Sequence, residues 1–462
     1  MGSLRDRSGR SGTARAIPIG RADQLRPLSG VASGGIASLL AGLIGIEIFT
    51  AVQVSELLIG LSLAMTWLTV ALTCFRGLSL FVQPRPSPAL LSDALLPTYT
   101  VFVPVFREAH MIPALVTGLS AANYPMEKLD IIFICEQSDR KTVEAAQSAS
   151  GGAFRTLVVP PPVPGGEPQT KPRALNYALE RSNGELVTIY DAEDRPHPDQ
   201  LRQAASALAT RPDWAAVQAP LQYYNTSDTA LAAQFAMEYD GLFRVLLPFY
   251  DRLGLPFPLG GTSNHMRRSA VERVGGWDAF NVTEDADLAF QLAGERNGIG
   301  WIDAPTLEEA VSTFRPWVRQ RSRWLKGFMA TWRVHARHPL ARGWRRGLML
   351  HLTVGATLLS IPFYAPVLFY LVAHSVAWML GIVDQGTPSV YLWTLGFSAM
   401  CNMAVGALGA VRAGRPDLLR HVPFMPLYWL LLLPPFYQAA VEMRTRPFHW
   451  HKTEHGVTDA PL

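Results

Sequence analysis

The sequence contains few charged residues and few cysteines, and both absences narrow the class of protein. Charged residues make up 17% of its 462 residues and hydrophobic residues 49%, a low charge fraction for a soluble protein of this length. Cys74, Cys135 and Cys401 have neither disulfide nor zinc-binding spacing, and we interpret them as small buried hydrophobic residues. No array of basic and aromatic residues of the kind that binds RNA or DNA is present, so we expect no nucleic-acid partner. The formal net charge is +4, and basic residues cluster beside apolar runs, which indicates contact with membrane lipids.

The long apolar runs lie at the two ends of the chain. Val31–Val52 and Leu57–Phe75 each approach the ~20 residues that cross a bilayer core. Leu348–Leu380 is broken by Pro362 and Pro366, and we interpret it as two short spans, with one long kinked helix as the alternative. The expected order of segments is a disordered basic tail (1–30), two transmembrane helices (31–82), a soluble domain (97–325), a helix in the interface plane (326–346), four further transmembrane helices (347–443) and a polar tail (444–462).

The basic N-terminal tail sets the expected orientation. By the positive-inside rule it places the N-terminus inside, so two crossings return the chain to the cytoplasm. A cytoplasmic C-terminal tail then requires an even number of crossings and favours six, although Arg412, Arg415 and Arg420 argue the other way. We expect a multi-pass protein of the bacterial inner membrane with its central domain in the cytoplasm.

The central domain alternates short β-branched runs with helical stretches. Alternation of this kind is typical of an α/β fold with a mostly parallel, Rossmann-like sheet and helices on both faces. Ligands bind such sheets beyond the carboxyl ends of the strands. The expected elements are strands at Tyr99–Val105, Asp130–Cys135, Thr156–Val159 and Glu185–Tyr190, and helices at Ile112–Ala122 and Lys171–Arg181.

Acidic residues cluster where strands end. Asp191, Glu193 and Asp194 follow the strand Glu185–Tyr190, and such a cluster repels itself unless a cation joins it. A divalent ion, Mg²⁺ or Mn²⁺, shared with diphosphate oxygens would resolve that repulsion. The alternative is a solvated acidic turn before Pro196.

Two predicted helix starts carry candidate residues. Lys171 opens a helix and could contact an anion there, or could belong to an ordinary helix start. Glu284 and Asp285 open another helix, where Asp285 could act on an acceptor hydroxyl or both acids could only compensate the helix dipole. Paired glycines at 260–261 and 275–276 precede Glu284 and Asp285 in the sequence and permit close approach of the backbone to a ligand.

The stretch around Trp324 is a further candidate. Gln320, Arg323 and Trp324 have i, i+3, i+4 spacing and share one helix face. Arginine can bind phosphate oxygens with two N–H groups, and tryptophan offers a flat face to a sugar or base. The alternative is a membrane-interface helix with routine arginine and tryptophan. We also place Glu108 and Glu136 among the substrate-binding residues.

The order of these motifs resembles the processive family 2 glycosyltransferases, the cellulose synthase and hyaluronan synthase group. Thr283-Glu284-Asp285 and the Gln-x-x-Arg-Trp motif at 320–324 stand intact, between membrane segments, from about Tyr99 to Trp324. The resemblance implies a GT-A fold and an inverting transfer, with Asp285 as the base and Glu284 beside it. It also implies that Gln320, Arg323 and Trp324 hold the diphosphate and the acceptor end.

The resemblance has two departures and sets the functional expectation. The family's Asp-x-Asp metal motif reads Asp191-Ala192-Glu193-Asp194 here, so either Glu193 or Asp194 takes the second position. The first acidic site has Glu136 with Asp139 rather than an aspartate pair.

We expect transfer of glucose from UDP-glucose to a growing β-linked polysaccharide with coupled export and partner subunits. The alternatives are transfer of one sugar to a lipid and a non-catalytic transporter.

The polar stretch at 448–456 looks like the C-terminal segment that closes over the nucleotide in this family. A metal-binding His/Glu cluster and a solvated tail are the alternatives.

Overall fold

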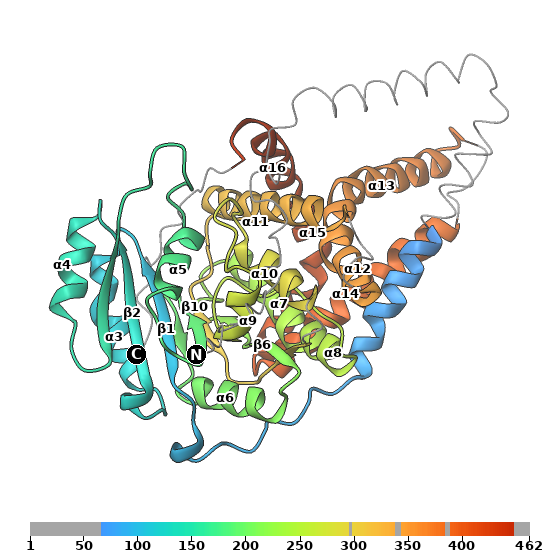
Figure 1. Cartoon of the computed structure of the whole chain (residues 1–462). Helices are drawn as coiled ribbons and strands as arrows, with labels where there is room; N and C mark the ends of the chain where they lie inside the picture. Colours follow the sequence, from blue (N-terminus) through green and yellow to red (C-terminus); the bar gives the residue numbers. More distant parts are fainter. Residues whose placement is uncertain (1–65, 295–297, 338–342, 384–388, 448–462) are drawn as a thin grey trace, which may run out of the picture.

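The computed structural model describes residues 66–294, 298–337, 343–383 and 389–447. A mixed sheet with helices on both faces forms the globular part, and long helices lie at its other end (Figure 1). The expected basic tail, the first expected crossing and the stretch at 448–456 lie outside the described residues. The expected second crossing is described only from Thr66, as part of the apolar helix Thr66–Phe81.

The main sheet has seven strands in the order β3-β2-β1-β4-β8-β6-β9. Among these strands β8 alone runs antiparallel to its neighbours. The predicted α/β fold with a mostly parallel sheet is therefore confirmed. The strands are β1 (Tyr99–Val105), β2 (Leu129–Glu136), β3 (Phe154–Val159), β4 (Leu186–Ile189), β6 (Trp214–Gln218), β8 (Asn264–Arg267) and β9 (Gly298–Trp301). A small second sheet has the order β5-β10-β7, with β5 at Arg195–Pro196, β7 at Leu221–Tyr223 and β10 at Thr306–Glu308.

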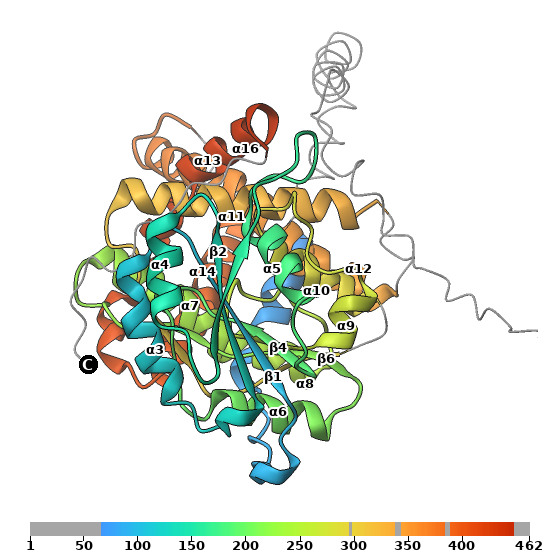
Figure 2. The ribbon, with the colours of Figure 1, turned by 60° about the vertical axis from the view of Figure 1, so that its left-hand side comes forward.

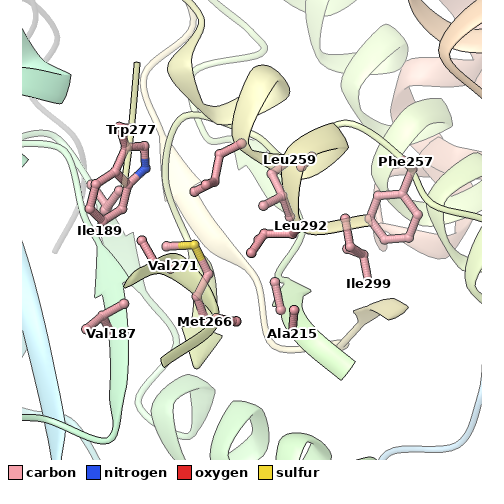
Figure 3. Close-up of a cluster of buried hydrophobic side chains, with 14 of the residues drawn as sticks. Val187, Ile189, Ala215, Phe257, Leu259, Met266, Val271, Trp277, Leu292 and Ile299 are labelled. Atoms are coloured by element: carbon pink, nitrogen blue, oxygen red, sulfur yellow. The ribbon is translucent and has the colours of Figure 1, made fainter. Parts of the chain in front are cut away.

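Side chains of the central strands alternate between two hydrophobic cores. Val101 and Val103 of β1 belong to one core, and Phe102 between them belongs to the other. This is the two-residue period of a strand buried on both faces. Figure 3 shows the second core, where Val187 and Met266 from the sheet face Leu292 of α10 and neighbouring helical residues.

Helices of the soluble domain divide between these two cores. One core is covered by α3 (Ile112–Ser120), α4 (Arg140–Ser148) and α6 (Gln200–Thr210). The other is covered by α5 (Lys171–Leu179), α9 (Arg268–Arg273) and α10 (Glu284–Gly294), and Figure 2 shows α5 and α10 on the opposite side of β1 and β2 from α3 and α4. Because the apolar side of α10 is anchored in this core, its acidic first turn has a fixed position at the edge of the sheet.

The C-terminal region is helical and apolar. It consists of α11 (Phe314–His335), α12 (Trp344–Leu350), α13 (Ala356–Met379), α14 (Ser389–Arg412), α15 (Met425–Leu430) and α16 (Leu433–Thr445), with a π-helical turn at His351–Gly355 and a 3-10 segment at Pro416–Phe424. In the described part of the chain, three helical runs are long and apolar enough to cross a membrane: Trp344–Met379, Val390–Arg412 and Pro416–Thr445.

The helix boundaries differ from the expected ones in two places. The expected interface helix (326–346) is divided, because α11 ends at His335 and α12 begins at Trp344. The stretch expected to form two spans is one helical run, Trp344–Met379. Pro362 and Pro366 lie inside α13, and each removes one backbone donor without ending the helix. The division of residues 347–443 into four crossings stays a prediction.

Helix α7 (Ala230–Gly241) joins the soluble domain to the apolar helices by packing along α14. A Cβ atom at Gly409 of α14 would lie 2.4 Å from the backbone nitrogen of Gly241, so the crossing needs glycine. The cysteines are unpaired, but only Cys135 is buried as expected. Cys74 is exposed and Cys401 is partly exposed, so the expectation that they are buried is wrong.

Candidate active site

The sheet topology brings the predicted acidic residues to one edge. β1 pairs in parallel with β2 and β4, so the carboxyl ends of all three strands lie side by side. Glu108 follows β1, Glu136 ends β2 and Asp191 follows β4. All three line one cavity of about 930 Å³. The strand ends predicted as a ligand site therefore share a single space.

Lys171 lies among the acidic residues of this cavity. Its ammonium donates to the Asp191 carboxylate and, over 3.0 Å, to the Gly261 carbonyl oxygen. Burial lowers the pKa of Lys171, but the Asp191 and Glu284 carboxylates outweigh burial and hold that pKa above its ordinary value. Lys171 therefore stays charged and neutralises part of the acidic cluster.

The turn after β4 separates its acidic residues by orientation. Glu193 lines the cavity, whereas Asp194 is buried and turned away from it. One Asp194 oxygen accepts from the Asp191 backbone N–H over 2.6 Å and from the Thr262 hydroxyl. Burial, followed by the Asp191 carboxylate, raises the pKa of both acidic side chains, that of Glu193 to about 8. Of the two residues that the sequence left as alternatives, Glu193 is the one available to a ligand.

The first turn of α10 presents Asp285 to the cavity. Asn281 supports the helix start, because its side-chain oxygen accepts from the Thr283 backbone N–H over 3.1 Å. Its side-chain nitrogen donates to the Thr331 hydroxyl of α11 over 3.0 Å. Burial, together with the neighbouring Glu284 carboxylate, raises the pKa of Asp285 to about 7. A carboxylate with this pKa can accept a proton near neutral pH.

Three predicted residues of α11 line the same cavity: Gln320, Arg323 and Trp324. The Trp324 ring stacks on Tyr239 of α7, with ring centroids 6.0 Å apart and an interplanar angle of 29°. The Gln320 side-chain oxygen is buried and has no hydrogen-bond donor among the described residues. A ligand N–H or O–H group that donated to this oxygen would satisfy it.

Glu136 lies at the far side of the acidic edge. Its carboxylate is 3.7 Å from the Arg173 guanidinium at the start of α5. Burial nevertheless raises the pKa of Glu136 to about 7. The structure thus places every predicted site residue except Asp194 on the cavity wall, while their roles stay predictions.

Sequence reasoning missed several residues of the cavity wall. Glu308 of β10 faces the acidic cluster, where burial and the Asp194 carboxyl raise its pKa well above the ordinary value. Arg321 ion-pairs with Glu238 of α7 and donates to the Tyr428 hydroxyl of α15 over 2.8 Å. Arg321 had a local signal, since it lies inside the Gln-x-x-Arg-Trp motif. No sequence motif or spacing marked the other three residues, Glu238, Tyr428 and Glu308.

A buried network fixes α10 against the two helices that follow it. His335 of α11 donates from Nε2 to the Asp287 carboxylate over 2.7 Å, and its Nδ1 accepts from the Arg346 guanidinium. Arg346 also donates to the Phe290 carbonyl oxygen over 2.8 Å. The imidazole thus links the cation of α12 to the carboxylate two residues after Asp285.

The cavity continues from the acidic edge between the apolar helices. Its wall there includes Thr73 of the Thr66–Phe81 helix, Tyr364 of α13, Asn402 of α14 and Trp429 of α15. Aliphatic side chains, among them Leu352 and Ile361, line the same part of the cavity. One space therefore connects the strand ends with the membrane-type helices.

The residues present suit a divalent ion that arrives with a diphosphate. No cluster of three metal-binding side chains is preformed in the described ranges. Mg²⁺ commonly uses one or two carboxylates together with substrate phosphates, and Asp191 and Glu193 supply two carboxylates beside the cavity. The Lys171 ammonium against Asp191 shows that this carboxylate already accepts a cation.

Comparison with known proteins identifies the domain. Residues 186–433 match the family described as "Glycosyl transferase family group 2". A probable glycosyltransferase of Bacillus subtilis, YdaM, is 26% identical over 243 residues, which cover 50% of this chain and 55% of that protein. The chain thus spans about half the length of that relative.

Two further relatives differ in how much of them is matched. A beta-monoglucosyldiacylglycerol synthase of Synechocystis is 25% identical over 441 residues, 85% of this chain and 84% of that protein. The UDP-forming cellulose synthase 1 catalytic subunit of Komagataeibacter xylinus is 26% identical over 271 residues, 57% of this chain and 35% of that protein. The resemblance to the cellulose synthase group inferred from the motifs is confirmed by these matches.

A solved structure shares the fold. The mannosyltransferase PcManGT of Pyrobaculum calidifontis, solved with GDP-Man and Mn²⁺, has a TM-score of 0.51 and 19% sequence identity. The superposition covers 83% of this chain and 98% of that one. The GT-A type fold expected from the sequence is confirmed by this likeness.

Proposed function

The chain belongs to glycosyl transferase family group 2, and we propose that it transfers glucose from UDP-glucose, with inversion, to a growing β-linked polysaccharide at the bacterial inner membrane. It is a glycosyltransferase with membrane-type helices. The observation that supports the acceptor is the continuous cavity, which joins the acidic strand ends to the apolar helices. A polymer that leaves between those helices would grow at the acidic end. Its export would use the six expected crossings and partner subunits.

The donor would bind at the strand ends. Asp191 and Glu193 would hold Mg²⁺ or Mn²⁺, which would neutralise the diphosphate leaving group. Arg323 and the Gln320 side chain line the same wall and would bind diphosphate and sugar oxygens. Glu136 would lie near the nucleoside, and Glu108 and Lys171 complete the donor side.

Asp285 would act as the general base. Its carboxylate would take the proton of the acceptor hydroxyl while that oxygen attacks the anomeric carbon. The bond from that carbon to the diphosphate oxygen breaks, and the nucleoside diphosphate leaves with the bonding electrons. Attack from the face opposite the leaving group inverts the anomeric centre. A positioned base of this kind is typically worth about 10²–10⁴-fold in rate.

Purified protein in nanodiscs and a panel of nucleotide-sugars test the donor and the base together. We expect UDP-glucose to be consumed with release of UDP and a β-linked product. Asp285→Asn should abolish transfer and leave UDP-glucose affinity, measured by calorimetry, within about two-fold of wild type. Near-normal synthesis by this variant would refute the base assignment, and turnover of GDP-mannose alone would refute the donor.

A second candidate acceptor is a lipid that receives one sugar. Two observations favour it: many cavity residues contributed by the apolar helices are aliphatic, and the Synechocystis relative, matched over 84% of its length, is a beta-monoglucosyldiacylglycerol synthase. Gel filtration of radiolabelled products separates the candidates. High-molecular-weight product supports the polymer, and product confined to a monoglycosylated lipid supports the lipid.

A further inference from the structure

Arg76 lies where the cavity passes between the apolar helices. It belongs to the Thr66–Phe81 helix and lines the cavity opposite α14. Figure 1 shows this blue helix running beside α14. The expected second crossing ends one residue earlier, at Phe75, so Arg76 lies at the boundary between bilayer core and soluble domain. Lipid phosphates lie at that depth.

Among the described residues, the hydrogen-bond partners of the Arg76 guanidinium are neutral. It donates to the Asn402 side-chain oxygen over 3.0 Å and to the Tyr250 hydroxyl. The nearest acidic residue in sequence to Tyr250 is Asp251, which ion-pairs with Arg85 over 2.9 Å. Within the part of the chain that the structure describes, no ion pair joins Arg76 to a carboxylate. An arginine at this boundary without a carboxylate partner can pair with an anionic ligand group.

The wall around Arg76 suits the head of an amphipathic anion. Thr73 lies one turn before Arg76 on the same helix, and its carbonyl oxygen is 3.8 Å from the Cys401 sulfur of α14. The two helices therefore touch on both sides of this turn. Leu72 and Val405 line the cavity near these polar groups and offer apolar surface to hydrocarbon. A polar anion-binding group bordered by aliphatic surface matches a lipid phosphate and not a neutral glycan.

We propose that Arg76 binds the phosphate of a lipid at the membrane end of the acceptor cavity, with Asn402 orienting the guanidinium. The inference rests on the proposed acceptor cavity, although binding is measured without transfer. The phosphate has two sources with the same chemistry, a phosphate carried by the lipid acceptor or the headgroup of a bilayer phospholipid. Guanidinium can bind two phosphate oxygens at once, which lysine cannot reproduce.

The binding test uses full-length protein in a phosphate-free detergent and dioleoylphosphatidic acid as the probe, with dioleoylglycerol as the uncharged comparison. Wild type should bind phosphatidic acid at least about ten-fold more tightly than Arg76→Gln, and Arg76→Lys should lie between them. Arg420→Gln, which removes an exposed arginine outside the cavity, is the matched control and should bind as wild type.

A second variant protects the test against misfolding. Asn402→Asp would place a carboxylate beside Arg76 without removing the arginine, so it should keep the fold and still lose phosphatidic acid binding. Equal binding by wild type, Arg76→Gln and Asn402→Asp would overturn the proposal, as would equal loss in Arg420→Gln.

Transfer assays then separate the two sources. If the acceptor carries the phosphate, Arg76→Gln raises the KM for a phosphate-bearing lipid acceptor at least about ten-fold and leaves the KM for UDP-glucose unchanged. If a bilayer phospholipid binds there, added phosphatidic acid stimulates wild type acting on uncharged acceptors but not Arg76→Gln. Hydrolysis of UDP-glucose without acceptor reports the proposed function separately, and it should be the same in wild type and both variants.

Discussion

Replacing Gly327 by alanine should slow sugar transfer without unfolding the protein. Gly327 of α11 follows the Gln-x-x-Arg-Trp motif and faces Thr283, the residue before the acidic first turn of α10. A Cβ atom at Gly327 would lie 2.2 Å from the Thr283 hydroxyl oxygen and 2.4 Å from its methyl carbon. Ordinary contacts begin at 3.4 Å, so the two helices must separate by about 1 Å.

The displacement acts directly on the candidate base. The Thr283 carbonyl oxygen accepts the Asp287 backbone N–H over 3.3 Å, which starts the hydrogen bonding of α10. A shift of Thr283 therefore moves Asp285 within the same turn. A misplacement of about 1 Å can cost about 10²-fold in rate, whereas overpacking typically costs about 1–3 kcal/mol of stability. We expect kcat to fall about 100-fold and the melting temperature to fall only slightly.

The assay is kcat by UDP release, with melting temperature measured in the same nanodiscs. Gly118→Ala is the matched control, because a Cβ atom at this exposed position of α3 meets no atom within 4 Å. Alanine favours helix there, so kcat should be unchanged and stability equal or higher. Thr283→Ser in the Gly327→Ala background removes the methyl contact and should restore part of the rate. Wild-type kcat in a folded Gly327→Ala variant would refute the reasoning.

Three other outcomes are expected at the site. Because Asp285 acts as a base only without its proton and its pKa is about 7, kcat should fall as the pH drops below about 7 and level off above it; a flat profile from pH 6 to 8 would contradict this. Glu193→Gln should raise the Mn²⁺ concentration needed for half-maximal rate at least about ten-fold. Asp194→Asn should leave that concentration unchanged and lower the melting temperature. The reverse pattern would assign the ion to Asp194. His335→Gln keeps one hydrogen-bond donor and one acceptor and should retain most of the wild-type kcat. In His335→Leu, which has neither, kcat should fall about ten-fold or more. Equal rates in both variants would show that these hydrogen bonds do not position α10.

The parts of the site that obey a local period could be predicted from sequence. Gln320, Arg323 and Trp324 were placed on one helix face by spacing alone, and all three line the cavity. Asp285 was placed in the first turn of a helix, where the structure has it. The β1 bounds also agree, because a strand buried on both faces is a continuous apolar run with clear ends.

Contacts between distant segments could not be predicted. Arg321 meets Glu238 across 83 residues of sequence and Tyr428 across 107. Neither partner belongs to a motif, so nothing in the sequence indicates that either of them meets Arg321. The contacts of the apolar helices could not be predicted from sequence for the same reason. Composition gives their length but does not show that Arg76 would meet Asn402, so the membrane end of the cavity was not foreseen.

The alternative between Glu193 and Asp194 shows why the metal site needed three-dimensional information. Both carboxylates follow the same strand, and the sequence assigns neither. Packing separates them, because Thr262, 68 residues further on, brings its hydroxyl to Asp194, and the turn's own backbone N–H donates to the same oxygen. Asp194 therefore holds the turn in shape, and that shape points Glu193 at the cavity. A substitution of Thr262 by valine removes this donor, so, like Asp194→Asn, it should lower the melting temperature and leave the Mn²⁺ concentration for half-maximal rate unchanged.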